Sequence, residues 1–173
     1  MINSYDTKAV IELVEFLSPE ERLDVRRKAL ECVMSYSGTE SSGDLFISNN
    51  YAVGKMSFKA ICRLCETSAS DTSYTLLILT NFSAESNEVA NFILTHSGCV
   101  QIAYDACQSH ADFANNAARL LANLSRYFPD KVNDILFRKD SNAINVLIDE
   151  AHIQPPPRYH VEHECVGHPT TVD

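Results

Sequence analysis

The sequence predicts an all-α protein: a right-handed α-solenoid of about three stacked helical repeats, followed by an unstructured C-terminal tail. Three observations predict this fold class. The phrase "ILTNFSA" returns 42 positions later as "LLANLSR". Most of the chain carries apolar residues at the three- and four-residue spacing of helices. Apolar residues make up 45% of the 173 positions and only 5 are Gly, a composition typical of an ordered helical domain.

Composition and charge argue against two classes of partner. The formal net charge of −9 repels phosphate backbones, and no run of Lys or Arg offsets it, so we do not expect nucleic acid to bind. The richest apolar stretch, "YTLLILTNF", is too short for a membrane-spanning helix. The N-terminus has no signal region, which predicts reduced thiols and a cytoplasmic protein, with the nucleus as a second compartment. A protein is therefore the expected partner.

The clearest helix signal is in "LSPEERLDVRRKALECVMSYSG". Ser18, Pro19 and Glu21 form a predicted capping box at its start, and Gly38 stands where a left-handed residue would end the helix. The preceding "DTKAVIELVEFL" predicts a shorter amphipathic helix. The face at helical spacing in the longer helix consists of Leu23, Arg26, Ala29, Leu30, Val33, Met34 and Ser37.

Two later blocks share one plan. The second begins with a short helix at "SSGDLFISNN" and continues with helices over roughly 54–66 and 72–84. The third again has a short helix, a middle helix opened by Gly98 and a longer apolar helix before Pro129. A further block starts at "DKVNDILF" and is not completed.

The blocks repeat with a measurable period. Asn123 follows Asn81 by 42 positions, and an offset of 46 aligns Ser35 with Asn81 and Tyr36 with Phe82. Periods of about 40 to 47 residues are those of armadillo and HEAT repeats. Three long helices are therefore expected to stack in parallel, each covered by shorter ones, over residues 1–153.

Two resemblances narrow this prediction. The stretch "ILTHSGCVQIAYDACQSHADFANNAARLLANLSR" resembles an armadillo repeat. The stretch "LVEFLSPEERLDVRRKALECVMSYSG", followed by "AICRLCE" and "LLILTNFSA", resembles the N-terminal part of the eukaryotic HGH family. That family consists of armadillo-like cochaperones that assist folding of translation elongation factor two. The similarity covers roughly residues 10–150 and implies a short or truncated form of a longer protein.

A polar stripe on the last helix of each block is the candidate protein-binding surface, because in a three-helix repeat that helix lines the concave face. The stripe comprises Arg27, Glu31 and Ser35, then Tyr74, Leu77 and Asn81, then Asn116, Arg119, Asn123 and Arg126.

The repeated Asn has two candidate roles. Its amide can bond both backbone groups of an extended peptide, as in the armadillo proteins that this chain resembles. Alternatively, it ties its helix to the neighbouring repeat. Importin-type grooves pair this Asn with a Trp; the chain has no Trp and offers Leu77 and Arg119 there, which argues against nuclear-signal binding.

The tail, 154–173, contains three consecutive prolines and loses the helical period. His160, His163, Cys165 and His168 have spacings that a zinc site uses, but no second ligand pair completes a known pattern, so we assign no metal. An unfolded tail with scattered histidines is the alternative, and the one we favour.

Other candidate chemistry has simpler explanations. Cys62 and Cys65 form a CxxC inside a predicted helix without a preceding strand, which favours core packing over redox activity. No nucleophile elbow, phosphate loop or helix-borne His pair occurs in the sequence, so we predict no enzyme and no cofactor.

The leading hypothesis is therefore a non-enzymatic cochaperone or adaptor. The family resemblance implies elongation factor two and cytosolic chaperones as partners. The alternative is a generic armadillo adaptor that binds an extended peptide in signalling or trafficking. A stack of only three repeats also leaves an apolar end uncovered, which predicts self-association.

Overall fold

The computed structural model describes residues 4–38 and 52–137, and within these residues the chain is all-helical, as predicted. The helix expected at the start of the second block, most of the unfinished fourth block and the tail with its histidines and Cys165 lie outside the described residues. The elements are α1 (Ser4–Glu15), α2 (Leu23–Ser37), α4 (Ala52–Thr67), a 3₁₀ turn (Ala69–Asp71), α5 (Thr72–Glu85), α6 (Asn87–Thr95), α7 (Ser97–Gln108), α8 (Ala114–Tyr127) and α9 (Pro129–Phe137).

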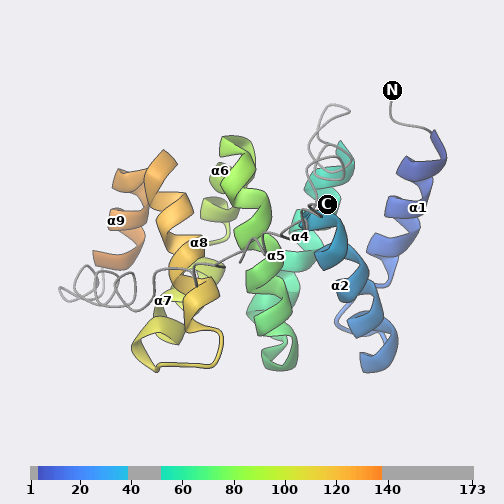
Figure 1. Ribbon diagram of the computed structural model, residues 1–173, viewed down its shortest axis with the longest axis horizontal. Coiled ribbons are helices and arrows are strands. Elements are labelled where there is room, and N and C mark those ends of the chain that lie inside the picture. The colour runs from blue at the N-terminus through green and yellow to red at the C-terminus, as the bar shows by residue number, and fades with distance from the viewer. Residues whose placement is uncertain (1–3, 39–51, 138–173) are drawn as a thin grey trace, which may run out of the picture.

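The helices follow one another along the long axis of the molecule in chain order (Figure 1). The last helices of the three blocks are neighbours: α2 packs against α5, and α5 packs against α8. A second row is formed by α1 on α4, α4 on α7 and α7 on α9. The short helix α6 contacts α4 and α5 of one block and α7 and α8 of the next. Each block therefore buries its apolar side chains against the following block.

Helix α5 lies in the middle of this arrangement and is buried on most of its surface. Its core contacts include Phe82, whose ring meets Phe58 of α4 edge to face with centroids 5.0 Å apart. Its buried hydroxyl groups bond within the helix: Thr80 Oγ1 donates to the Leu76 carbonyl at 2.7 Å, and Ser83 Oγ donates to the Thr80 carbonyl at 3.0 Å. A helix with apolar residues all round is expected to be enclosed by others.

The start of α2 differs from the prediction. The helix begins at Leu23 rather than after Ser18, so the predicted capping box is wrong. Ser18 instead organises a turn, because its carbonyl accepts the Glu21 N–H at 3.1 Å and its Oγ accepts the Glu20 N–H at 3.4 Å. Leu23, expected inside, is 44% exposed. Gly38 has φ −89°, so the left-handed helix end predicted there is also wrong.

Candidate protein-binding face

The predicted surface residues all lie on α2, α5 and α8, the three helices that pack side by side. We call these nine residues together the polar face. Its residues are exposed or half-buried: Arg27, Glu31 and Ser35 on α2, Tyr74 and Asn81 on α5, and Asn116, Arg119, Asn123 and Arg126 on α8.

The two equivalent Asn residues tie neighbouring blocks together. Asn81 Nδ2 donates to Ser37 Oγ of α2 at 3.0 Å. Asn123 Nδ2 donates to Ser83 Oγ of α5 at 3.2 Å and to the Thr80 carbonyl at 3.0 Å. Among the described residues, neither Asn has a hydrogen bond to its side-chain oxygen, so each Oδ1 is left as an acceptor. The donor half of each amide therefore serves the contact between helices, as the second of the two candidate roles predicts.

The serine acceptors of these bonds confirm the register between blocks. Ser37 and Ser83 are 46 positions apart, the same offset that places Ser35 under Asn81. Ser35 itself is exposed. In α2 the position equivalent to Asn81 is thus occupied by an exposed residue with a short hydroxyl side chain.

Arg126 is also engaged within the fold. Its Nη2 donates to the Ala84 carbonyl at 2.8 Å, and the guanidinium lies 4.7 Å from the centre of the Tyr127 ring. Tyr127 Oη donates to the same carbonyl at 3.2 Å. A cation beside the last carbonyls of a helix is stabilising, so this residue anchors α8 to the C-terminal end of α5.

Three of the remaining polar-face residues fall into two groups. Glu31 accepts a 2.9 Å hydrogen bond from Lys28 on the same helix. Arg27 and Arg119 are exposed and form no hydrogen bond or ion pair with the rest of the described chain. On α8 Arg119 stands between Asn116 and Asn123 with no acidic residue in that helix. Within the described chain it is therefore an exposed cation without an ion-pair partner.

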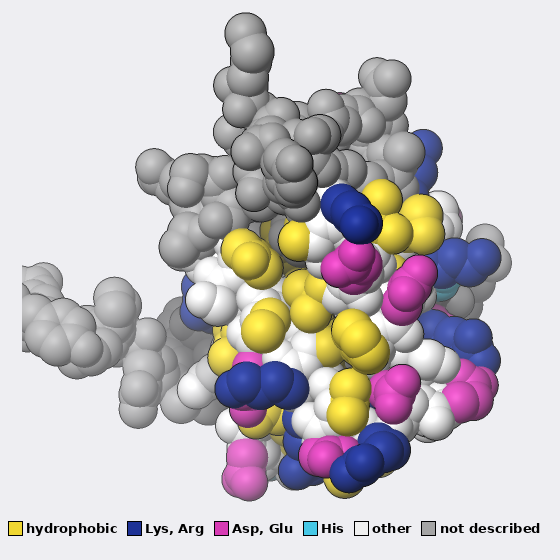
Figure 2. All heavy atoms as spheres, turned by 90° about the vertical axis from the view of Figure 1, so that its right-hand side faces the viewer, with side chains coloured by type: hydrophobic (Ala, Val, Ile, Leu, Met, Phe, Trp, Pro, Cys, Tyr) yellow, Lys and Arg dark blue, Asp and Glu magenta, His cyan; other side chains and the backbone are white. Residues whose placement is uncertain are grey.

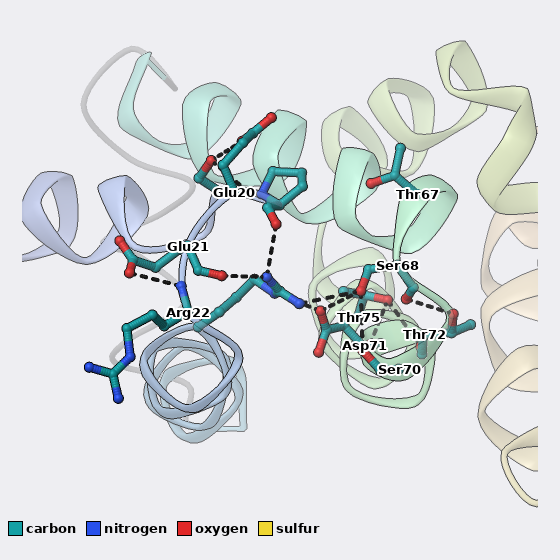
Figure 3. A network of polar contacts seen from close by, with 12 residues as sticks. Glu20, Glu21, Arg22, Thr67, Ser68, Ser70, Asp71, Thr72 and Thr75 are labelled. Carbon is teal, nitrogen blue, oxygen red and sulfur yellow. Dashed lines mark hydrogen bonds and ion pairs between the residues drawn. The ribbon is translucent and has the colours of Figure 1, made fainter.

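A buried ion pair between α2 and α5 was missed by the sequence analysis (Figure 3). Arg26 Nε donates to Asp71 Oδ2 at 2.7 Å, and the two side chains are only 8% and 0% exposed. Arg26 Nη1 also donates to the Pro19 and Glu21 carbonyls, at 3.1 and 2.8 Å. Ser68 Oγ donates to Asp71 Oδ2 at 2.7 Å, whereas Asp71 Oδ1 is buried without a hydrogen bond within the described chain.

The sequence contained a signal for this pair. Arg26 stands at helical spacing with Leu30 and Val33, on the face that was predicted to be buried. A charged residue on a buried face needs a partner, because an unpaired charge in the interior is very costly. Asp71, at the start of α5, supplies it. The pair joins α2 to α5 and is structural in character.

A groove of about 540 Å³ lies between the end of α4 and α7, and its lining includes Cys65, Glu66, Asp105 and Phe113. Hydrogen bonding with Cys99, together with burial, raises the pKa of Cys65 far above its ordinary value. The Cys65 thiol is therefore protonated at neutral pH and a poor nucleophile. Cys62 and Cys65 are both free and buried, which supports the core-packing interpretation of the CxxC.

Within the ranges 4–38 and 52–137, no group of three or more His, Cys, Asp or Glu side chains is arranged to hold a metal ion. None of the helices described there is both long and apolar enough to cross a bilayer. Comparison with known proteins found no matching family model, no matching curated protein and no matching solved structure.

Proposed function

We propose that this chain is an armadillo- or HEAT-like solenoid that binds a protein partner on the polar face, acting as a cochaperone or adaptor rather than as an enzyme. The resemblance to the HGH family suggests a folding intermediate of elongation factor two as client, handled with cytosolic chaperones in the cytoplasm. The chain-order stacking of the blocks and the repeated Asn-to-Ser bonds between them support a solenoid.

The observation that carries the binding proposal is the free cation on α8. In a chain of net charge −9, Arg119 is exposed, without a partner among the described residues and flanked by half-buried amides. Such a surface offers charge-assisted and neutral hydrogen bonds to a partner that is acidic or has exposed backbone groups.

Copurification of the tagged full chain from eukaryotic cells tests the proposal. We expect elongation factor two or cytosolic chaperones to be enriched with the wild-type chain and lost with Arg119→Glu. The matched control is Lys59→Glu, which makes the same charge reversal at an exposed position on α4. Recovery of unrelated signalling proteins alone would refute the cochaperone assignment. Equal recovery with both variants would refute the polar face as the binding site.

A second candidate is a generic adaptor that binds an extended peptide. The observation in its favour is that Oδ1 of Asn81 and of Asn123 has no hydrogen bond to the described chain, so each can accept one from a peptide N–H. Ser83→Ala removes one tie of Asn123 but keeps its amide. A peptide recovered with the chain should therefore bind Ser83→Ala normally and Asn123→Ala weakly, when both variants are measured well below their unfolding temperatures.

A further inference from the structure

The end of the molecule formed by α1 and α2 exposes a cluster of apolar side chains (Figure 2). Ile11 is 36% exposed, and Phe16 and Leu23 are each 44% exposed. Hydrophobic side chains lie near the middle of this end and charged ones are distributed around them. An apolar patch with a polar rim is typical of a protein interaction site. We call this surface the N-terminal end face.

A groove of about 400 Å³ crosses the N-terminal end face between the two helices. Helix α1 packs mainly on α4, so it stands apart from α2 and leaves this space open. The charged residues at the groove are Asp24 and Lys28. Its lining is otherwise apolar: Leu13, Phe16, Val25, Ala29 and Cys32.

The equivalent positions of the next block show which neighbour covers this side of the last helix there. The 46-residue offset aligns Val25 with Asp71 and Ser35 with Asn81. Both of these residues bond to α2: Asp71, the N-cap of α5, to Arg26, and Asn81, within α5, to Ser37. The same row on α2 has no helix of the preceding block on it in the described chain. Within the described chain, α2 therefore lacks the neighbour on this side that α5 has in α2.

We propose that the occupant is a second copy of this chain, bound about a two-fold axis with its α2 antiparallel to the first. A two-fold interface must be self-complementary. Asp24 and Lys28 are one helical turn apart, so an axis passing between them sets Asp24 of each copy opposite Lys28 of the other. Phe16 of each copy then enters the groove of its partner.

The ion pairs that Asp24 and Lys28 form within one chain can be replaced by ion pairs between two copies. Asp24 pairs with Arg22 and Lys28 pairs with Glu31, both at 2.9 Å, and all four side chains are at least 44% exposed. Exposed ion pairs contribute little to stability and rearrange readily. Enclosure between two copies strengthens the Coulomb attraction within each pair, and the desolvation of the charges offsets part of it.

Light scattering after size-exclusion chromatography and sedimentation equilibrium of the full chain test this proposal. Over the micromolar range we expect the mass to rise toward twice the 19.3 kDa of one chain. Phe16→Glu should weaken the dimer at least tenfold. The matched control Met56→Glu, at a 53% exposed site on α4, should leave it unchanged. Circular dichroism and melting temperature confirm that each variant is folded.

A charge exchange tests the two-fold arrangement itself. Asp24→Lys alone and Lys28→Asp alone each place like charges opposite one another and should weaken the dimer, whereas the double variant should restore it. A wild-type chain that stays monomeric at every concentration overturns the proposal. So does a dimer that Phe16→Glu leaves intact, a double variant as weak as the single ones, or a monomer that uses Phe16 to bind a different protein.

Discussion

Replacing Asn123 with Ala removes two hydrogen bonds between α8 and α5, to the Thr80 carbonyl at 3.0 Å and to Ser83 Oγ at 3.2 Å. Each such bond contributes about 1 kcal/mol net. The Thr80 carbonyl keeps the 3.0 Å hydrogen bond from Ser83 Oγ, so it is not left unsatisfied. We therefore expect the free energy of unfolding to fall by about 1–2 kcal/mol. Asn81→Ala, which removes one bond, should cost about half as much.

Urea unfolding followed by circular dichroism measures this loss. With a slope of about 1–3 kcal/mol per M, the midpoint should move down by roughly 1 M. A double-mutant cycle of Asn123→Ala and Ser83→Ala isolates their shared hydrogen bond, and we expect a coupling energy of about 0.5–1 kcal/mol. A coupling of zero would refute only the bond to Ser83. If Asn123→Ala unfolds like the wild type, the amide does not hold the blocks together. Its role would then lie in partner binding alone.

The remaining predictions concern the interior. Arg26→Met should cost about 3–5 kcal/mol in urea unfolding, because it leaves the Asp71 carboxylate buried without its charge partner; a loss below about 1 kcal/mol would contradict this. Gly98→Ala should cost about 1 kcal/mol, since the added Cβ would lie 2.5 Å from Glu66 Oε1, and the cost should shrink in a Glu66→Ala background. Hydrogen bonding to Cys62 and burial raise the pKa of Cys99. At neutral pH its thiol should therefore react with a disulfide reagent at least about tenfold more slowly in the folded chain than in the chain unfolded in urea.

The repeat was predictable because it depends on local patterns that the sequence states twice. The 42-residue echo places Asn81 and Asn123 at equivalent points of α5 and α8, and both bond to the preceding helix. The chemistry of that contact was less predictable. An Asn amide can form hydrogen bonds to a bound peptide or to a neighbouring helix equally well. The positions of Ser37 and Ser83 in the folded chain are what direct the Nδ2 groups of the two Asn residues to the neighbouring helix.

Local signals did not predict where α2 begins or which residue pairs with Arg26. Ser18 and Glu21 match a capping box, but α2 begins only at Leu23, and Arg26 donates to the Pro19 and Glu21 carbonyls of the turn before it. The sequence placed Arg26 on the inward face without naming its partner, since Asp71 lies 45 positions further along the chain. Such pairings depend on how the blocks pack, which a local pattern does not contain.

The enclosure of α5 by its neighbours protects the chain from aggregation. Its core segment, "YTLLILTNF", is free of charge and proline and rich in residues that favour strands. In the folded chain α2 covers one side of this helix and α8 covers the other. Loss of either neighbour would uncover a stretch suited to intermolecular β-pairing. Cleavage or truncation on one side of α5 is therefore expected to yield aggregates rather than a smaller soluble fragment.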